Sequence, residues 1–399
     1  MKKRQTMVLD KELVELLFST VYIERWNDTV RPVSFTELDK QAHKMIAAWY
    51  LAAMHERKGC EVKWHRLVDH LVAETLYRAV VTDLHPVVYR QIRKHKREAL
   101  DAFVAEDLKK RLHKKAYKPF KKYLESDENG TERRILAAAS HLATAWEFEI
   151  IRRFNPDEKA VREIADAIAA NEEKFADLPG MKALRKKPKA RRFLTVCASL
   201  RFQKRWTKVP RLPRTSVLGH MGFVALAGYF LTLSYGGSRT KRVNNFFTGL
   251  FHDLPEALTK DIITPLKYGV PGLKKLVAGI EEKMLEKEVY PLLPKGEVRE
   301  RLRFYLADEF VDRVRREDGT VRRVESERKM LEKYNRGADA VDGRLMKAAD
   351  HLGAYTEALY AVRNGIRSAE LEQALCILRQ TYRKKSPYGL PLAELLDSL

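Results

Sequence analysis

Cysteine is scarce in this chain. The three cysteines, Cys60, Cys197 and Cys376, are odd in number and have no close pair spacing. This argues against a disulfide framework and against a thiolate metal site. The usage is typical of a reducing compartment, and the stretch 1–14 has no long apolar region that would indicate a signal peptide. We therefore expect a cytoplasmic protein.

Long hydrophobic runs and strand signals are also rare. The most apolar run, 221–233, is too short to span a bilayer and begins beside His220, so we expect a buried core helix and no membrane partner. Period-two alternation is sparse, and no Asn-Gly or Asp-Gly turn lies between two clear apolar runs. These absences argue against a β fold.

Apolar residues instead recur three and four positions apart. Examples are Ala42, Met45, Ile46, Trp49 and Tyr50, and later Leu352, Tyr355, Leu359 and Val362. This spacing gives a helix one apolar face, so the sequence predicts an all-α fold. A chain of 399 residues exceeds the size at which one core usually stops growing, so we expect two domains.

Acidic residues are the minority charge. There are 76 Lys and Arg against 54 Asp and Glu, which gives a net charge of +22. Such an excess attracts anions, although a simply solvated basic face fits as well. Much of it lies in 93–122 and 185–205, without an RNA-binding signature or a Cys/His finger. A small phosphorylated partner is therefore the first expectation, and nucleic acid the second.

The two halves carry the same landmarks in the same order. Arg25-Trp26 corresponds to Arg205-Trp206, each pair being followed by a proline-containing turn and a helix with an embedded histidine, His43 or His220. Further on, 136–155 and 346–365 share the pattern A-A-x-H-L. We interpret this as a tandem duplication. Two unrelated domains with alanine-rich helices remain the alternative. A Pro, Gly and basic cluster at 177–192 predicts the linker, which gives domains 1–180 and 181–399.

The halves differ where metal ligands would lie. Ser140 stands in place of Asp350, and Leu71 after His70 stands in place of Asp253. Neither Ser nor Leu is a useful ligand for a divalent ion in this setting. We therefore expect domain 1–180 to be a degenerate copy without metal and domain 181–399 to bind it.

An adjacent His252-Asp253 pair is the centre of the candidate site. Imidazole nitrogen and carboxylate oxygen are complementary ligands for a divalent metal, and Glu256 follows His252 by four positions. His220 lies on a helix that is apolar on nearly all sides, and Asp350 lies among alanines, so each needs a polar or cationic partner. The alternatives are a capping or surface pair, a hydrogen-bonded core histidine, and an Arg or Lys partner for Asp350.

The order of these residues, H…HD…D, resembles that of the HD-domain metal-dependent phosphohydrolases, and the closer likeness is to the bacterial HD-domain 5′-deoxynucleotidases. The similarity covers roughly the second half of the chain. It is carried by Arg205-Trp206, by HDxxExLTxD over 252–261, by TPxK over 264–267 and by ADxLxAY over 349–355.

The resemblance implies a helical HD bundle that holds one divalent ion, which ligand type does not restrict beyond Mn²⁺, Co²⁺, Fe²⁺, Zn²⁺ or Mg²⁺. It implies a metal-activated water, with Glu256 handling protons and Asp253 both ligating and catalytic. The residues implied as metal ligands are His220, His252, Asp253 and Asp350, and those implied to contact substrate are Arg205, Trp206, Asp261, Thr264 and Lys267.

This chain departs from the family pattern in two places. Lys260 replaces the glycine of a T-G-D step, and Leu218-Gly219 precede His220 where the nucleotidases carry polar residues. Both changes are expected to border the substrate pocket, so they put the choice of substrate in doubt.

The expected function is hydrolysis of a (deoxy)nucleoside 5′-monophosphate or a similar phosphate ester. A larger anionic nucleotide or an oligonucleotide end is an alternative substrate. A non-catalytic nucleotide- or nucleic-acid-binding regulator with a structural HD site is an alternative function. Since the family commonly forms homodimers, we expect a monomer in which the first half occupies the partner's place as an internal pseudo-dimer. Alternatively, the first half binds a regulatory nucleotide through Arg25 and Trp26.

Overall fold

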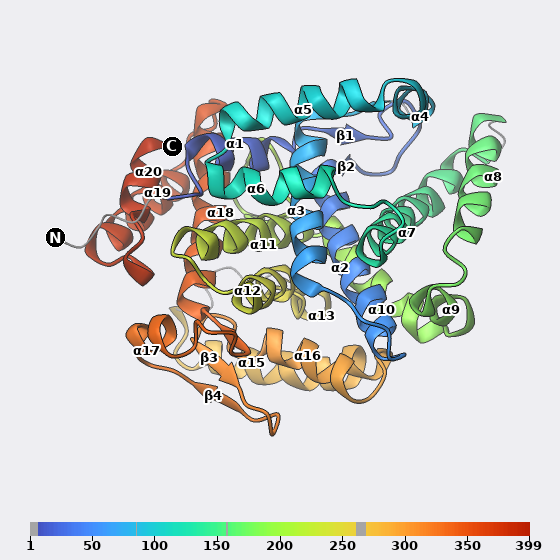
Figure 1. Cartoon of the computed structure of the whole chain (residues 1–399). Coiled ribbons are helices and arrows are strands. Elements are labelled where there is room, and N and C mark those ends of the chain that lie inside the picture. Colours follow the sequence, from blue (N-terminus) through green and yellow to red (C-terminus); the bar gives the residue numbers. More distant parts are fainter. Residues whose placement is uncertain (1–6, 85, 157–158, 261–268) are drawn as a thin grey trace.

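Helices make up most of the chain (Figure 1). The computed structural model describes residues 7–84, 86–156, 159–260 and 269–399. Over these residues the predicted all-α class is confirmed, and the few strands are two or three residues long.

The first half begins with a short helix and a two-stranded ribbon, which lead into two long helices and then a layer of further helices. Its elements are α1 (Lys11–Ser19), β1 (Glu24–Arg25), β2 (Phe35–Thr36), α2 (Glu37–Glu56), α3 (Trp64–Val81), α4 (Pro86–His95), α5 (Arg97–Arg111), α6 (Lys114–Leu124), α7 (Thr131–Phe154) and α8 (Lys159–Glu173).

The second half is also mainly helical and contains a small sheet near its middle. Its elements are α9 (Pro179–Lys186), α10 (Pro188–Ser199), α11 (Val217–Ser234), α12 (Arg239–Phe251), α13 (Glu256–Thr259), α15 (Leu273–Met284), α16 (Glu297–Leu306), β3 (Arg313–Arg315), β4 (Val321–Arg323), α17 (Glu327–Glu332), β5 (Ala340–Val341), α18 (Gly343–Arg363), α19 (Ala369–Lys384) and α20 (Leu392–Ser398).

The strands form two small antiparallel sheets. In the first, β1 pairs with β2, with Glu24 opposite Thr36. In the second, β3 lies between β4 and β5, with Arg313 opposite both Arg323 and Val341. β5 ends just before α18, so this sheet holds the start of the helix that carries Asp350.

Two long helices, α2 and α11, lie at the centre of the molecule. Each begins at a hydroxyl residue whose side chain accepts a hydrogen bond from a backbone N–H three positions later, Thr36 from Asp39 and Ser216 from Gly219. Such caps satisfy N–H groups that have no partner within the helix. α11 is long and apolar enough to cross a membrane, but 94% of that stretch is buried inside the protein. The expected buried core helix is therefore confirmed.

The predicted linker at 177–192 is wrong. These residues form all of α9 and the start of α10, and Met181 and Leu184 are buried. Gly180 lies so close to α2 that a Cβ atom there would come within 2.6 Å of Leu51. Proline at the first position of both helices favours their start rather than a flexible connection. The buried apolar residues of both halves accordingly form one continuous core.

α2 and α11 pack closely because small residues lie where they cross. A Cβ atom on Gly222 would lie 2.8 Å from the Cβ of Ala42. One on Gly219 would lie 2.9 Å from a carboxylate oxygen of Asp39, which accepts a hydrogen bond from the Ser216 hydroxyl. The small residue before His220 is thus explained by packing against the first half, and the expectation that it borders the substrate pocket was wrong for Gly219.

Candidate metal centre

His220 enters the site from the first turns of α11. It is 1% exposed, and its ring lies between two carboxylates. Nε2 is 3.1 Å from Oδ1 of Asp350, and Nδ1 is 3.5 Å from Oε1 of Glu357. A Cβ atom on Gly353 would come within 2.9 Å of the His220 ring, so glycine at that position of α18 leaves room for the imidazole.

His252 and Asp253 follow the last residue of α12. His252 caps that helix, and the chain then turns before α13 begins at Glu256, so His252, Asp253 and Glu256 do not lie on one continuous helix. The ring N–H at Nδ1 of His252 donates to the carbonyl of Gly249 over 2.7 Å. This bond leaves Nε2 facing Oδ2 of Asp253 at 3.1 Å.

Asp350 reaches the same point from α18. Its Oδ1 is 3.1 Å from Nε2 of His220 and 4.0 Å from Nε2 of His252. Its other oxygen accepts from the Lys347 ammonium at 2.8 Å. The lysine partner considered as an alternative is therefore present, but it occupies one oxygen and leaves the other directed at the histidines.

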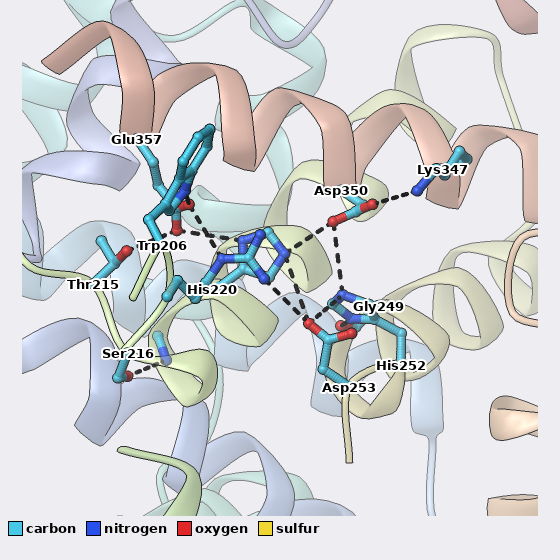
Figure 2. A network of polar contacts seen from close by, with 12 residues as sticks. Trp206, Thr215, Ser216, His220, Gly249, His252, Asp253, Lys347, Asp350 and Glu357 are labelled. Carbon is cyan, nitrogen blue, oxygen red and sulfur yellow. Dashed lines mark hydrogen bonds and ion pairs between the residues drawn. The ribbon is translucent and has the colours of Figure 1, made fainter. Parts of the chain in front are cut away.

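The four predicted ligands converge from three separate segments (Figure 2). The nitrogens of His220 and His252 and an oxygen of Asp253 lie within 4.8 Å of one another, and Asp350 Oδ1 lies within 4.0 Å of both rings. Nδ1 of each ring is directed at an oxygen. In a neutral histidine with its proton on Nδ1, Nε2 carries a lone pair, and here each Nε2 faces carboxylate oxygens, which are also hydrogen-bond acceptors. Such an arrangement fits a cation between them, and two imidazoles with two carboxylates suit a divalent metal that keeps open positions.

Both carboxylates stay ionised in this setting. Burial acts to raise the pKa of Asp253, but His252, His220 and Arg205 outweigh it and hold the pKa at about 2. Burial likewise opposes the charge of Asp350, and Lys347 and His220 nevertheless lower its pKa well below the usual range. Each is thus available as an anionic ligand at neutral pH.

Glu357 organises the residues around the metal ligands, and the sequence analysis missed it. Its side chain is 2% exposed. It accepts from the Trp206 indole N–H at 2.8 Å and from the Thr215 hydroxyl at 2.8 Å. Its Oε1 faces His220, and such a carboxylate behind a ligating histidine fixes the ring's orientation.

Arg205 lies at the edge of the site. Its Nε donates to Glu357 over 3.2 Å, and its Nη1 is 3.5 Å from Oδ2 of Asp253. The structure therefore brings Arg205, a predicted substrate contact, beside the candidate metal ligands. Trp206 is half-buried beside it, and the cation over its ring is Arg211 at 5.8 Å rather than Arg205.

The remaining candidates divide into two groups. Glu256 starts α13. Burial acts to lower the pKa of Arg205, but the carboxylates of Glu357, Asp253, Asp350 and Glu256 outweigh it and raise that pKa. The Glu256 side chain therefore lies within electrostatic reach of the site. Three predicted substrate contacts lie outside the described residues, namely Asp261, Thr264 and Lys267.

Lys260 has a backbone conformation that favours glycine. Its φ is 63° and its ψ is 162°, a combination that residues with a Cβ atom rarely adopt. The backbone at this position therefore has the conformation that a glycine would favour, although the residue is a lysine. This substitution stores strain next to the site.

The first half contains a matching network without the ligands. Glu147 stands seven positions after Ser140, as Glu357 does after Asp350. It accepts from Arg25 at 3.0 Å and from the Trp26 indole at 2.9 Å. Arg25 and Trp26 therefore contact a buried carboxylate in the first half as Arg205 and Trp206 do in the second.

Lys40, rather than His43, stands at the position of His220. Each lies four residues after its helix cap, Thr36 or Ser216. Burial and the neighbouring Arg25 lower the pKa of Lys40 to about 7, although Glu37 acts in the opposite direction. An amine therefore replaces an imidazole at this position, and the pairing of His43 with His220 was wrong.

Comparison with known proteins places the metal ligands inside one matched segment. Residues 197–376 match the family model described as HD domain. No curated protein and no solved structure matches the chain. The match contains all four converging side chains, and HD domains are in general metal-dependent phosphohydrolases that bind divalent ions. The match therefore supports an HD domain over residues 197–376.

Proposed function

We propose that this protein hydrolyses the phosphate monoester of a (deoxy)nucleoside 5′-monophosphate, using one divalent ion held by His220, His252, Asp253 and Asp350. The proposal rests on the convergence of these four side chains and on Arg205, whose Nη1 lies 3.5 Å from Oδ2 of Asp253. When bound, the ion would lower the pKa of a water and offset charge on a phosphoryl oxygen.

The chain's own residues supply the rest of the chemistry. Arg205 offers a planar set of donors that suits a phosphate, and the buried Glu357 holds it by Nε. Glu256, at the start of α13, would take a proton from water or give one to the leaving group. A positioned carboxylate typically contributes about a hundred- to ten-thousand-fold to such a step.

A nucleotide as substrate is the finer part of the proposal. Its support is the resemblance to the 5′-deoxynucleotidases, together with a half-buried Trp206 whose indole N–H is held by Glu357 at 2.8 Å. Trp206 would lie against the sugar. The net charge of +22 also suits larger anions, so an oligonucleotide end and a polyphosphorylated nucleotide belong in the substrate panel.

The same proposal gives the first half a structural role, as a duplicated copy in the place of a dimer partner. Ala42 and Gly222 each stand six positions after their helix cap, and they meet where α2 and α11 cross. Equivalent residues contact each other on a twofold axis, so this contact supports an internal pseudo-dimer. Sedimentation should then give a monomer, and a stable dimer would contradict this part.

A phosphate-release assay tests the function. Wild-type protein stripped of metal should release phosphate from one or more members of a nucleotide panel only after Mn²⁺ or Co²⁺ is added. Asp253→Asn should abolish release, whereas the exposed Asp318→Asn should not. Metal binding without release from any phosphate ester, together with salt-dependent binding of DNA or RNA, would favour the regulator instead.

A further inference from the structure

A separate pocket lies where the two halves meet, away from the metal centre. It has a volume of about 410 Å³ and lies between the starts of α3 and α12, the end of α16 and strand β3. Volumes of roughly 300 to 1,000 Å³ are usual for sites that bind small molecules. The pocket is lined by α12 from Arg239 to Asn244, and His252 follows the last residue of that helix, so about 12 Å of helix separates the lining from the candidate metal ligands.

The lining of this pocket is strongly basic. Lys63, His65, Arg239, Arg301 and Arg315 line it, against one carboxylate, Asp339. Two of the arginines are held by acidic partners, since Arg315 binds Asp339 at 2.6 Å and Arg301 binds Glu56 at 2.9 Å. Arg239 is exposed and has no carboxylate within ion-pair distance among the described residues.

The backbone adds to this positive field. Residues 62–63 and 239–240 line the pocket, so it lies at the N-terminal ends of both α3 and α12. The N–H groups at such ends favour anions. The pKa of His65 is lowered by burial and by Arg239, which is consistent with a positive potential at the pocket.

We propose that this junction pocket binds a phosphoryl anion, either orthophosphate or the phosphate of a nucleotide. Arg239 would make the direct charge contact, and the Thr240 hydroxyl is a further polar group in the lining. The Trp64 ring is already covered by the Arg301 guanidinium at 4.7 Å and lies edge-on to Phe247. Recognition therefore rests on the phosphoryl charge rather than on stacking of a base. The proposal does not depend on the function of the metal centre.

Calorimetric titration of the metal-stripped, full-length protein tests this site. Orthophosphate, AMP and adenosine are the probes, in buffer at physiological salt without free chelator. Arg239→Ala removes the exposed contact, and Arg367→Ala is a control with the same change in net charge at an exposed position outside the pocket. Asp253→Asn tests whether the anion binds at the candidate metal ligands instead of in the pocket.

We expect one phosphoryl anion to bind per chain. Arg239→Ala should bind it at least about tenfold more weakly, because a hydrogen bond to a charged group is strong. Arg367→Ala and Asp253→Asn should bind as wild type does. Equal affinity for orthophosphate and AMP identifies the free anion as the ligand, whereas tighter binding of AMP without binding of adenosine identifies a nucleotide. The proposal is overturned if neither anion binds at millimolar concentration, if Arg239→Ala binds normally, or if Arg367→Ala weakens binding equally.

Discussion

Glu357 and Glu147 hold equivalent groups in the two halves. Glu357 accepts from Trp206 and contacts Arg205, and Glu147 accepts from Trp26 and contacts Arg25. Both glutamates occupy the same position in the aligned segments 136–155 and 346–365. The four ligands were predictable because they stand in a recognisable order. Glu357 was not, because its role depends on a fold that brings α18 beside Thr215 and Trp206.

Gly353 offers a test of how tightly His220 is positioned. In Gly353→Ala the new Cβ atom would lie 2.9 Å from the imidazole, so the ring must turn away from Asp350. Metal affinity should fall by about ten- to a hundredfold, as when a group that orients a ligand is lost. Calorimetric titration with Mn²⁺ measures this. Gly279→Ala, where a Cβ atom meets nothing within 4 Å, is the matched control and should bind metal normally.

Lys260 should be replaceable by glycine with a gain in stability. Its positive φ with extended ψ costs a residue with a Cβ atom about 1–3 kcal/mol, and glycine escapes most of that cost. Lys260→Gly should therefore raise the free energy of unfolding by about 1 kcal/mol, after allowance for glycine's greater chain entropy. Urea denaturation measures the change. Lys275→Gly, inside α15, should lower stability by about 1 kcal/mol, and a loss in both variants would contradict the strain argument.

Glu147 should make stability depend on acid pH. Burial raises its pKa, but Arg25 and Arg201 outweigh this and lower it from 4.5 to about 2. A carboxylate with a lowered folded pKa stabilises the protein above its unfolded pKa, and this contribution is lost as pH falls from about 4.5 towards 2. Glu147→Gln should be less stable than wild type at pH 7, and its stability should fall less than that of wild type when the pH is lowered. Urea midpoints across this range check it, and the exposed Glu149→Gln should follow wild type.

At the scale of elements, the crossing of α2 and α11 shows what periodicity does and does not reveal. Apolar spacing predicted helices through Ala42 and through 221–233, and both exist. It did not predict that these helices contact each other, because that depends on small residues at one crossing point. Composition alone likewise predicts a linker at 177–192, because it does not show what these residues pack against. The Pro, Gly and basic residues of this segment start helices and cover Leu51 of α2.

Gly222 tests the crossing directly. A Cβ atom there would lie 2.8 Å from that of Ala42, so Gly222→Ala should destabilise the protein by about 1–3 kcal/mol despite the better helix propensity of alanine. Because the contact is between two Cβ positions, Ala42→Gly combined with Gly222→Ala should restore much of the loss. Thermal unfolding of the single and double variants measures both effects. Equal loss in the double variant would show that the two positions do not oppose each other.

At the scale of the whole molecule, metal binding should stabilise the fold. A ligand that binds the native state alone adds about 2.7 kcal/mol when present at a hundred times its dissociation constant. Mn²⁺ or Co²⁺ should therefore raise the unfolding temperature of metal-stripped wild-type protein. Asp350→Ala should remove that increase, whereas Asp318→Ala in an exposed turn should keep it. An equal increase in both variants would mean that the stabilising metal binds elsewhere.

The central claim is that four side chains from three segments hold one divalent ion. Anomalous diffraction from crystals grown with Mn²⁺, collected at the manganese edge, tests it most directly. We expect one strong peak within bonding distance of Nε2 of His220, Nε2 of His252 and the carboxylates of Asp253 and Asp350. A manganese ion at full occupancy bound elsewhere, with Asp350 still in direct contact with His220, would contradict this claim.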